Sequence, residues 1–176
     1  MGPSSTLSKS YIPEVGADAA PETVVVGETY VEPVTGLTWT VTPVGTMKTR
    51  DEAVAVCEAA AVAGQSGWRL PTVAEARGLV RDCADLEVGG ACPAGDGCLD
   101  STCNADTCKT CQTPSSQPGG QCKAVLEMQQ GWDGAPWYWT SDEAADTGQY
   151  WVYNLCQGAL NVVYGASLYD VRCVRQ

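Results

Sequence analysis

The sequence predicts an α+β domain, in which two helices lie between an early strand and a late antiparallel sheet. Residues 49–64 and 72–80 each begin with a helix-start signal, and residues 37–41 and four later runs have strand-like patterns. Ten cysteines and no histidine indicate a disulfide framework. With 176 residues, the chain is long enough for one domain with a core of its own.

Residues 1–33 form a predicted extended N-terminal arm, and residues 34–176 form the domain that follows. The arm holds five acids, one lysine and four prolines, a composition typical of an extended segment. Residues 22–31 within it are rich in β-branched side chains and can form a strand. We expect this strand to belong to the same domain; the alternative is that it adds to the sheet edge of a neighbouring molecule.

The first strand and both helices follow from local patterns. Residues 37–41 (LTWTV) alternate between apolar and polar side chains, which predicts a strand. Residues 49–52 (TRDE) and 72–75 (TVAE) are capping boxes, in which the threonine caps the helix start and the glutamate reaches back. The first helix is predicted to end at Gly64, and the second to continue through Val80.

Residues 83–122 form a predicted cysteine-rich insertion in the domain. They hold seven of the ten cysteines and many turn-forming residues, but they show no periodic apolar pattern. Such a segment buries little apolar surface, so disulfides must order it. Four strand-like runs follow the insertion, at residues 137–140, 150–156, 159–164 and 170–175.

Charge and composition exclude several classes of function. Lys plus Arg is 10 and Asp plus Glu is 21, so the formal net charge is −11. Such a surface repels nucleic acid and anionic lipid, and no apolar run approaches the roughly 20 residues that span a bilayer. Without histidine, the chain lacks Ser-His, Cys-His and His-metal chemistry. We therefore expect no enzyme activity, no cofactor, no nucleic-acid partner and no membrane insertion.

Two alternatives involving metals arise in the insertion. One is a set of hard oxygen ligands at short spacing: Asp96, Asp100, Asn104 and Asp106. These could hold Ca²⁺, although the EF-hand pattern is not met. The other is the spacing of Cys103, Cys108 and Cys111, which matches three ligands of an iron–sulfur site and could also suit zinc. Turn acids and disulfides explain both patterns, so we expect no metal.

Several motifs occur together and in a fixed order: GLTW at residues 36–39, GWRLPT at 67–72, YWTS at 138–141 and VRCVR at 171–175. Through them the chain resembles the Lcl C-terminal domain family, named for the C-terminal domain of a Legionella collagen-like adhesin. The resemblance covers about residues 34–81 and 136–176, and it implies a C-type lectin-like fold.

Structural details follow from this resemblance. It implies that the N- and C-terminal strands pair and that Cys57 is bonded to Cys173. Cys156 is expected to tie the insertion to the sheet, and the pairing of the other cysteines stays open. Arg69 and Arg172, within the shared motifs, are expected to form ion pairs or to hold carbonyl groups.

The resemblance also implies a function, namely a secreted or surface-displayed adhesion module whose ligand is a glycan or a protein. Some C-type lectin-like domains carry their binding diversity near the C-terminal strands and loops. The corresponding stretch mixes adaptable polar and rigid aromatic side chains, as binding faces do: Asn154, Gln157, Asn161, Tyr164, Ser167 and Tyr169. The alternative is that these are ordinary solvated residues.

Two further expectations concern the mode of action. The Glu-Pro-Asn and Trp-Asn-Asp motifs of calcium-dependent sugar binding are missing, so we expect a calcium-independent mode. The alternative function is a structural subunit of an extracellular appendage or sheath, a homo-oligomer or polymer assembled through residues 1–33.

Overall fold

The structure, a computed structural model, describes residues 29–95, 97–109, 111, 137–145 and 148–176. Its strands are β1 (Thr29–Val31), β2 (Thr38–Thr40), β3 (Gly45–Lys48), β4 (Tyr138–Glu143), β5 (Gln149–Asn154), β6 (Ala159–Tyr164), β7 (Tyr169–Val171) and β8 (Val174–Arg175). Its helices are α1 (Arg50–Ala59), α2 (Val73–Arg77), α3 (Asp106–Lys109) and the 3-10 helix η1 (Ser101–Cys103). These elements confirm the predicted α+β class.

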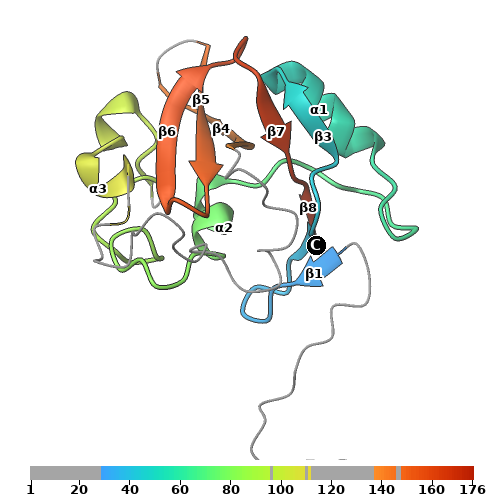
Figure 1. The fold of residues 1–176 in the computed structure, drawn as a ribbon, viewed down its shortest axis with the longest axis horizontal. Coiled ribbons are helices and arrows are strands. Elements are labelled where there is room, and N and C mark those ends of the chain that lie inside the picture. The colour runs from blue at the N-terminus through green and yellow to red at the C-terminus, as the bar shows by residue number, and fades with distance from the viewer. Residues whose placement is uncertain (1–28, 96, 110, 112–136, 146–147) are drawn as a thin grey trace, which may run out of the picture.

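The strands form two sheets (Figure 1). One has three strands in the order β1-β2-β8, and the other has five in the order β3-β7-β4-β5-β6. β2 pairs antiparallel with β8, as the implied pairing of the N- and C-terminal strands requires. β1 also pairs with β2, so residues 29–31 of the predicted arm belong to the domain. The rest of the strand predicted at residues 22–31 lies outside the described residues.

The last predicted strand, at residues 170–175, is in fact two strands. β7 pairs with β3 and β4 in the larger sheet, whereas β8 pairs with β2 in the smaller one. Arg172 and Cys173 lie where the chain passes from one sheet to the other, and the Cys173 N–H donates to Thr40 Oγ1 at 3.1 Å. β7 runs parallel to β4, so the late sheet is mixed and not purely antiparallel as predicted.

Both predicted capping boxes are present, and both helices end earlier than predicted. Thr49 and Thr72 cap α1 and α2, and the glutamate three residues later bonds back in each case. α1 ends at Ala59 because Ala60 takes an extended conformation, well before Gly64. α2 ends at Arg77, since the next amides bond to carbonyl groups three residues back and form tight turns.

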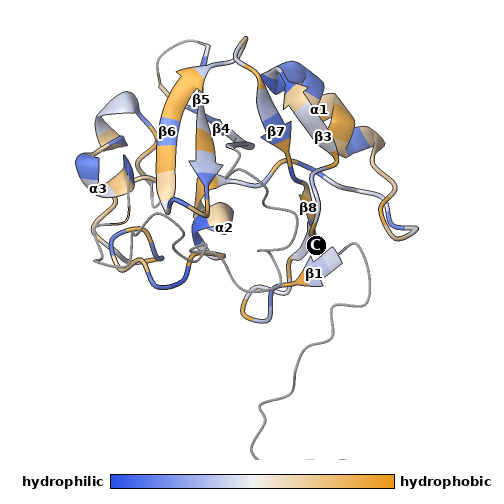
Figure 2. Cartoon of the chain, in the orientation of Figure 1, coloured by the Kyte–Doolittle hydropathy of each residue, from blue (hydrophilic) through white to orange (hydrophobic). Residues whose placement is uncertain are grey.

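The core has two parts, and together they cover both faces of the larger sheet. Trp39, Trp151 and Tyr153 belong to the part that includes α2 and the insertion. Trp139 and Cys57 belong to the part under α1. Figure 2 colours each residue by hydropathy, and β6 of the larger sheet is hydrophobic over most of its length. The five-stranded sheet is therefore packed between α1 on one face and α2 with the insertion on the other.

Two arginines of the shared motifs have structural roles, as expected. The buried Arg172 donates from Nη1 to the carbonyl groups of Thr40 and Val41, and its guanidinium lies 5.0 Å from the centre of the Tyr138 ring. Arg69 donates to Glu75 and forms an ion pair with it at 2.6 Å.

Disulfides order the described part of the insertion, and their pairing is nested. Cys83 is bonded to Cys111, Cys92 to Cys108, and Cys98 to Cys103, so each bridge encloses the next. Cys57 is bonded to Cys173, as the resemblance implies. Cys156 is also disulfide-bonded, with its partner outside the described residues. It lies in the turn after β5 and not within the strand predicted there.

The insertion packs directly on the larger sheet. The indole Nε1 of Trp151 donates to the carbonyl of Leu99 at 2.8 Å, and the Cys111 N–H donates to the carbonyl of Gln157 at 3.4 Å. η1 and α3 lie here, in a region predicted to be irregular, because Asp100 caps η1 and the disulfides fix both short helices.

Candidate functional site

The six predicted binding residues do not form one surface patch. Asn154 and Gln157 lie at one end of the β5–β6 hairpin, whereas Tyr164, Ser167 and Tyr169 lie at the other end, where β6 passes into β7 (Figure 1). β6 separates the two groups, and a six-residue strand spans about 17 Å. At most one of the two ends can therefore contact a small ligand.

The residues at the end near Asn154 make hydrogen bonds that stabilise the turn and its contact with the insertion. The Asn154 side chain is buried, and its Oδ1 accepts a hydrogen bond from the Gln157 N–H at 2.9 Å, which fixes the turn. Gln157 is exposed, but its carbonyl holds Cys111 of the insertion. Asn161, midway along β6, accepts at Oδ1 from Asn104 Nδ2 at 3.1 Å. Asn154 and Asn161 thus have structural partners that account for their polarity.

The opposite end presents an aromatic side chain on a fixed turn. Tyr164 is 66% exposed, so most of its side chain is open to a partner. The Ser167 N–H donates to the Tyr164 carbonyl at 2.9 Å and closes the turn. Tyr169 packs edge-on against Trp139, with 5.2 Å between ring centroids.

Neighbouring elements hold this turn in place. The carbonyl of Gly165 accepts from the Arg50 N–H at 2.9 Å, and the Gly165 N–H donates to the Gly148 carbonyl at 3.0 Å. A Cβ added at Gly165 would lie 3.0 Å from the Tyr150 ring, so glycine permits this close packing. The Arg50 guanidinium lies 4.8 Å from the centre of the same ring. The turn is thus anchored to α1 and to β5.

Two exposed apolar residues at this end could not be found from the sequence. Met47 is 62% exposed and Leu168 is 47% exposed, and the Met47 N–H donates to Asp170 Oδ1 at 3.0 Å. Met47 lies in β3, a short strand that was not predicted because its residues show no alternation. β3 is four strands from β6 in the sheet. We therefore call only the surface of the turn between β6 and β7 the β6–β7 face, made of Tyr164, Ser167 and Leu168.

The residues considered as metal ligands have other partners in the structure. Asp100 accepts from the N–H and the hydroxyl of Thr102, and Asp106 forms an ion pair with Lys109 at 3.0 Å. Asn104 bonds Asn161, and Asp96 lies outside the described residues. Cys103, Cys108 and Cys111 are all disulfide-bonded, so their sulfurs are not thiolate ligands.

Two carboxyl groups beside the start of α2 have pKa values shifted in opposite directions. Glu75 accepts from Arg69 Nη2 at 2.6 Å and from the Thr72 N–H at 2.8 Å. Burial raises its pKa, but these bonds and the charge of Arg69 outweigh burial and lower the pKa below 4.5. Asp142 accepts from the Val73 N–H at 2.6 Å, and burial raises its pKa above 3.8.

These shifts predict opposite effects of pH on the free energy of unfolding. The contribution of Glu75 is present above pH 4.5 and is lost as pH falls through its lower folded pKa. The contribution of Asp142 is present below pH 3.8 and is lost as pH rises through its higher folded pKa. In urea unfolding across acidic pH, Glu75→Gln should flatten the loss of stability in acid, and Asp142→Asn should reduce the loss on raising the pH. Unchanged profiles would contradict the prediction.

The comparison with known families covers nearly the whole chain. The model of the Lcl C-terminal domain matches residues 28–175. The chain belongs to the Lcl C-terminal domain family. No curated protein sequence matches it. The matched range begins just before β1 and ends in β8, so the Lcl C-terminal domain contains both sheets and the insertion. Its family relationship to an adhesin indicates a surface module.

Across the described residues, this Lcl C-terminal domain has no helix that combines the length and apolar character needed to cross a bilayer.

Proposed function

We propose that this chain is a secreted or surface-displayed adhesion module of C-type lectin-like type, which binds a glycan or a protein through its β6–β7 face. The observation that carries the proposal is the exposed Tyr164 on an anchored turn, in a domain of an adhesin-related family. The role is binding rather than catalysis.

The chemistry of the β6–β7 face supports this role. Tyr164 and Leu168 offer apolar area to a partner, and Ser167 and the Tyr164 hydroxyl offer polar groups at the same place. Because the turn is fixed by bonds to Arg50 and Gly148, little conformational entropy is lost when a ligand binds. Preorganisation of this kind favours affinity over adaptability.

The disulfides support a location outside the cell. Four bridges join cysteines within the described residues, and Cys156 is bonded as well. Bridges of this density persist in oxidising compartments.

We propose that binding does not require calcium. Asp100, Asn104 and Asp106 are engaged by neighbouring side chains, and this supports the proposal. The test is a printed array of glycans and extracellular proteins, probed with the full-length chain in buffer with Ca²⁺ and in buffer with EDTA. We expect specific spots with equal intensity in both buffers. Loss of all signal in EDTA would overturn calcium independence, and a lack of specific spots in both would overturn the binding function.

A structural subunit is the second candidate, and the position of β1 favours it. β1 lies at an edge of its sheet with β2 as its partner, and Val31 on it is 57% exposed. An edge strand can accept a strand from another molecule. Light scattering of the full chain and of residues 29–176 discriminates the two functions. An adhesion module stays monomeric in both forms, whereas a subunit polymerises only with residues 1–28 present.

A further inference from the structure

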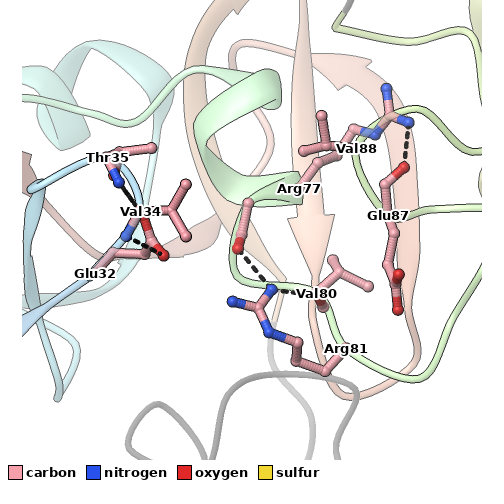
Figure 3. Close-up of a pocket in the computed structure, with 9 residues that line it drawn as sticks. Glu32, Val34, Thr35, Arg77, Val80, Arg81, Glu87 and Val88 are labelled. Atoms are coloured by element: carbon pink, nitrogen blue, oxygen red, sulfur yellow. Dashed lines mark hydrogen bonds between the residues drawn. The ribbon is translucent and has the colours of Figure 1, made fainter.

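A cavity of about 470 Å³ opens between the β1–β2 loop and the segment that follows α2 (Figure 3). One side is lined by Glu32, Val34 and Thr35, and the other by Arg77, Gly78, Val80, Arg81, Glu87 and Val88. Its size is within the range of small-ligand sites. It lies near β1 and α2, at the opposite end of the molecule from the β6–β7 face (Figure 1), so it is a separate site.

Three valines give the cavity an apolar lining. Val80 is buried beneath it, whereas Val34 is 87% exposed and Val88 is 65% exposed. Figure 3 shows Val34 and Val88 on opposite sides of the space. Covering two exposed valines with a ligand removes apolar surface from water and favours binding of an aliphatic group.

Most charged groups around the cavity are already bonded within the fold. The Glu32 carboxylate accepts from the N–H groups of Val34 and Thr35, at 3.1 and 2.7 Å, and from the Thr35 hydroxyl at 2.6 Å. The buried Arg77 donates to the carbonyl groups of Leu86, Glu87 and Ala94 at 2.6–2.8 Å. Neither group needs a ligand to complete its bonding.

Arg81 differs from these groups because only one of its guanidinium nitrogens donates within the described residues. Burial raises the pKa of Glu32, but the hydrogen bonds to its carboxylate and the positive charge of Arg81 together lower it. Arg81 is exposed, and its Nη1 donates to the carbonyls of Gly78 and Val80, at 2.8 and 2.7 Å. Its Nε and Nη2 have no hydrogen-bond partner among the described residues. These two adjacent donors match the two oxygens of a carboxylate. Figure 3 shows the guanidinium turned toward the side of the cavity that holds Glu32.

We propose that this cavity binds an aliphatic carboxylate. The alkyl chain lies against Val34, Val80 and Val88, and the carboxylate accepts hydrogen bonds from Arg81. A free alkyl acid and the C-terminal carboxylate of a peptide that ends in aliphatic residues share this chemistry.

The test is an NMR titration of the ¹⁵N-labelled full-length chain with octanoate, octanamide and acetate, each below its aggregation concentration. Octanoate should shift the amide signals of residues 78–81 and 87–88 in a saturable way. Octanamide lacks the charge and acetate lacks the alkyl chain, so both should bind at least about tenfold more weakly. No saturable shift with octanoate, or equal affinity for octanoate and octanamide, would overturn the proposal.

Variants test separately which residues bind the carboxylate and which bind the alkyl chain. Arg81→Gln should weaken octanoate about tenfold and leave octanamide unchanged, whereas Val88→Ser should weaken both. Gln65→Ala, an exposed change elsewhere, is the control and should change neither. Signals remote from the cavity report whether each variant is folded. If folded Arg81→Gln binds octanoate as the parent does, the carboxylate does not contact Arg81 and the proposal is wrong.

A further pair of ligands distinguishes the two sources of the carboxylate. If N-acetyl-leucyl-leucine binds more tightly than octanoate and its C-terminal amide does not bind, the site takes a peptide terminus. If octanoate binds more tightly, the site takes a free acid. Tyr164→Ala should leave both affinities unchanged, so this test is independent of the function proposed for the β6–β7 face.

Discussion

Replacing Cys57 and Cys173 together by alanine is expected to lower the free energy of unfolding by about 5 kcal/mol. The two residues are 116 positions apart, and their bridge joins α1 to the segment between β7 and β8. A bridge that closes so long a loop removes much conformational freedom from the unfolded chain. The other bridges lie inside this loop and shorten it, so about 5 kcal/mol is an upper value. Urea unfolding without reductant measures the change.

The bridge between Cys98 and Cys103 provides the matched control. It closes a loop of 5 positions, and Cys98→Ala with Cys103→Ala should cost only about 2 kcal/mol. If both double variants lose the same stability, the connection between α1 and the C-terminal strands is not what stabilises the domain.

Arg77→Ala is expected to lower the free energy of unfolding by about 4 kcal/mol. The Arg77 side chain is 1% exposed, and it donates to three carbonyl groups in the first part of the insertion. Alanine leaves those carbonyls without their charged donor in a buried place. Arg77→Lys should recover only part of the loss, since one ammonium group cannot reproduce the planar fork. Thermal and urea unfolding measure both changes.

Arg175 is the matched control for Arg77. It is half-buried at the C-terminus, with its guanidinium 5.9 Å from the centre of the Trp68 ring. Arg175→Ala should cost less than about 1 kcal/mol. If Arg77→Ala costs no more than Arg175→Ala, then the three hydrogen bonds do not hold the insertion.

Local signals in the sequence predict local structure well. The capping boxes at Thr49 and Thr72 begin α1 and α2, because each satisfies helix amides with side chains a few residues away. Alternation predicts β2, and the apolar run at residues 159–164 predicts β6. These elements depend on neighbours in sequence, so a single chain contains enough information to predict them.

Tertiary pairing explains what the sequence alone does not predict. β3 has no alternation, and it is a strand because β7 pairs with it. The sequence of residues 170–175 is strand-like over its whole length and gives no sign of a break. In the structure the chain passes from the larger sheet to the smaller one at Arg172 and Cys173. Cysteine spacing left the nested pairing open, and Cys57–Cys173 followed only from the resemblance.

The candidate site shows the same limit. Asn154 and Tyr164 fall in one stretch of sequence, but β6 carries them to opposite ends of the sheet. The buried Asn154 side chain accepts a hydrogen bond that fixes the turn. In the sequence, an asparagine with this structural role cannot be distinguished from an exposed asparagine that binds a ligand. The exposed Met47 is held beside β7 by its bond to Asp170, a contact 123 positions apart in the chain, which no local pattern predicts.

Binding of three proteins to the same array ligand tests the β6–β7 face most directly: the parent chain, Tyr164→Ala and Gln157→Ala. Both residues are exposed and lie at opposite ends of one hairpin, so Gln157→Ala reports the effect of truncating an exposed side chain away from the proposed face. We predict that Tyr164→Ala weakens binding about thirtyfold, as loss of a central aromatic contact does, and that Gln157→Ala binds as the parent. Undiminished binding by folded Tyr164→Ala, or loss confined to Gln157→Ala, would contradict the assignment of the β6–β7 face.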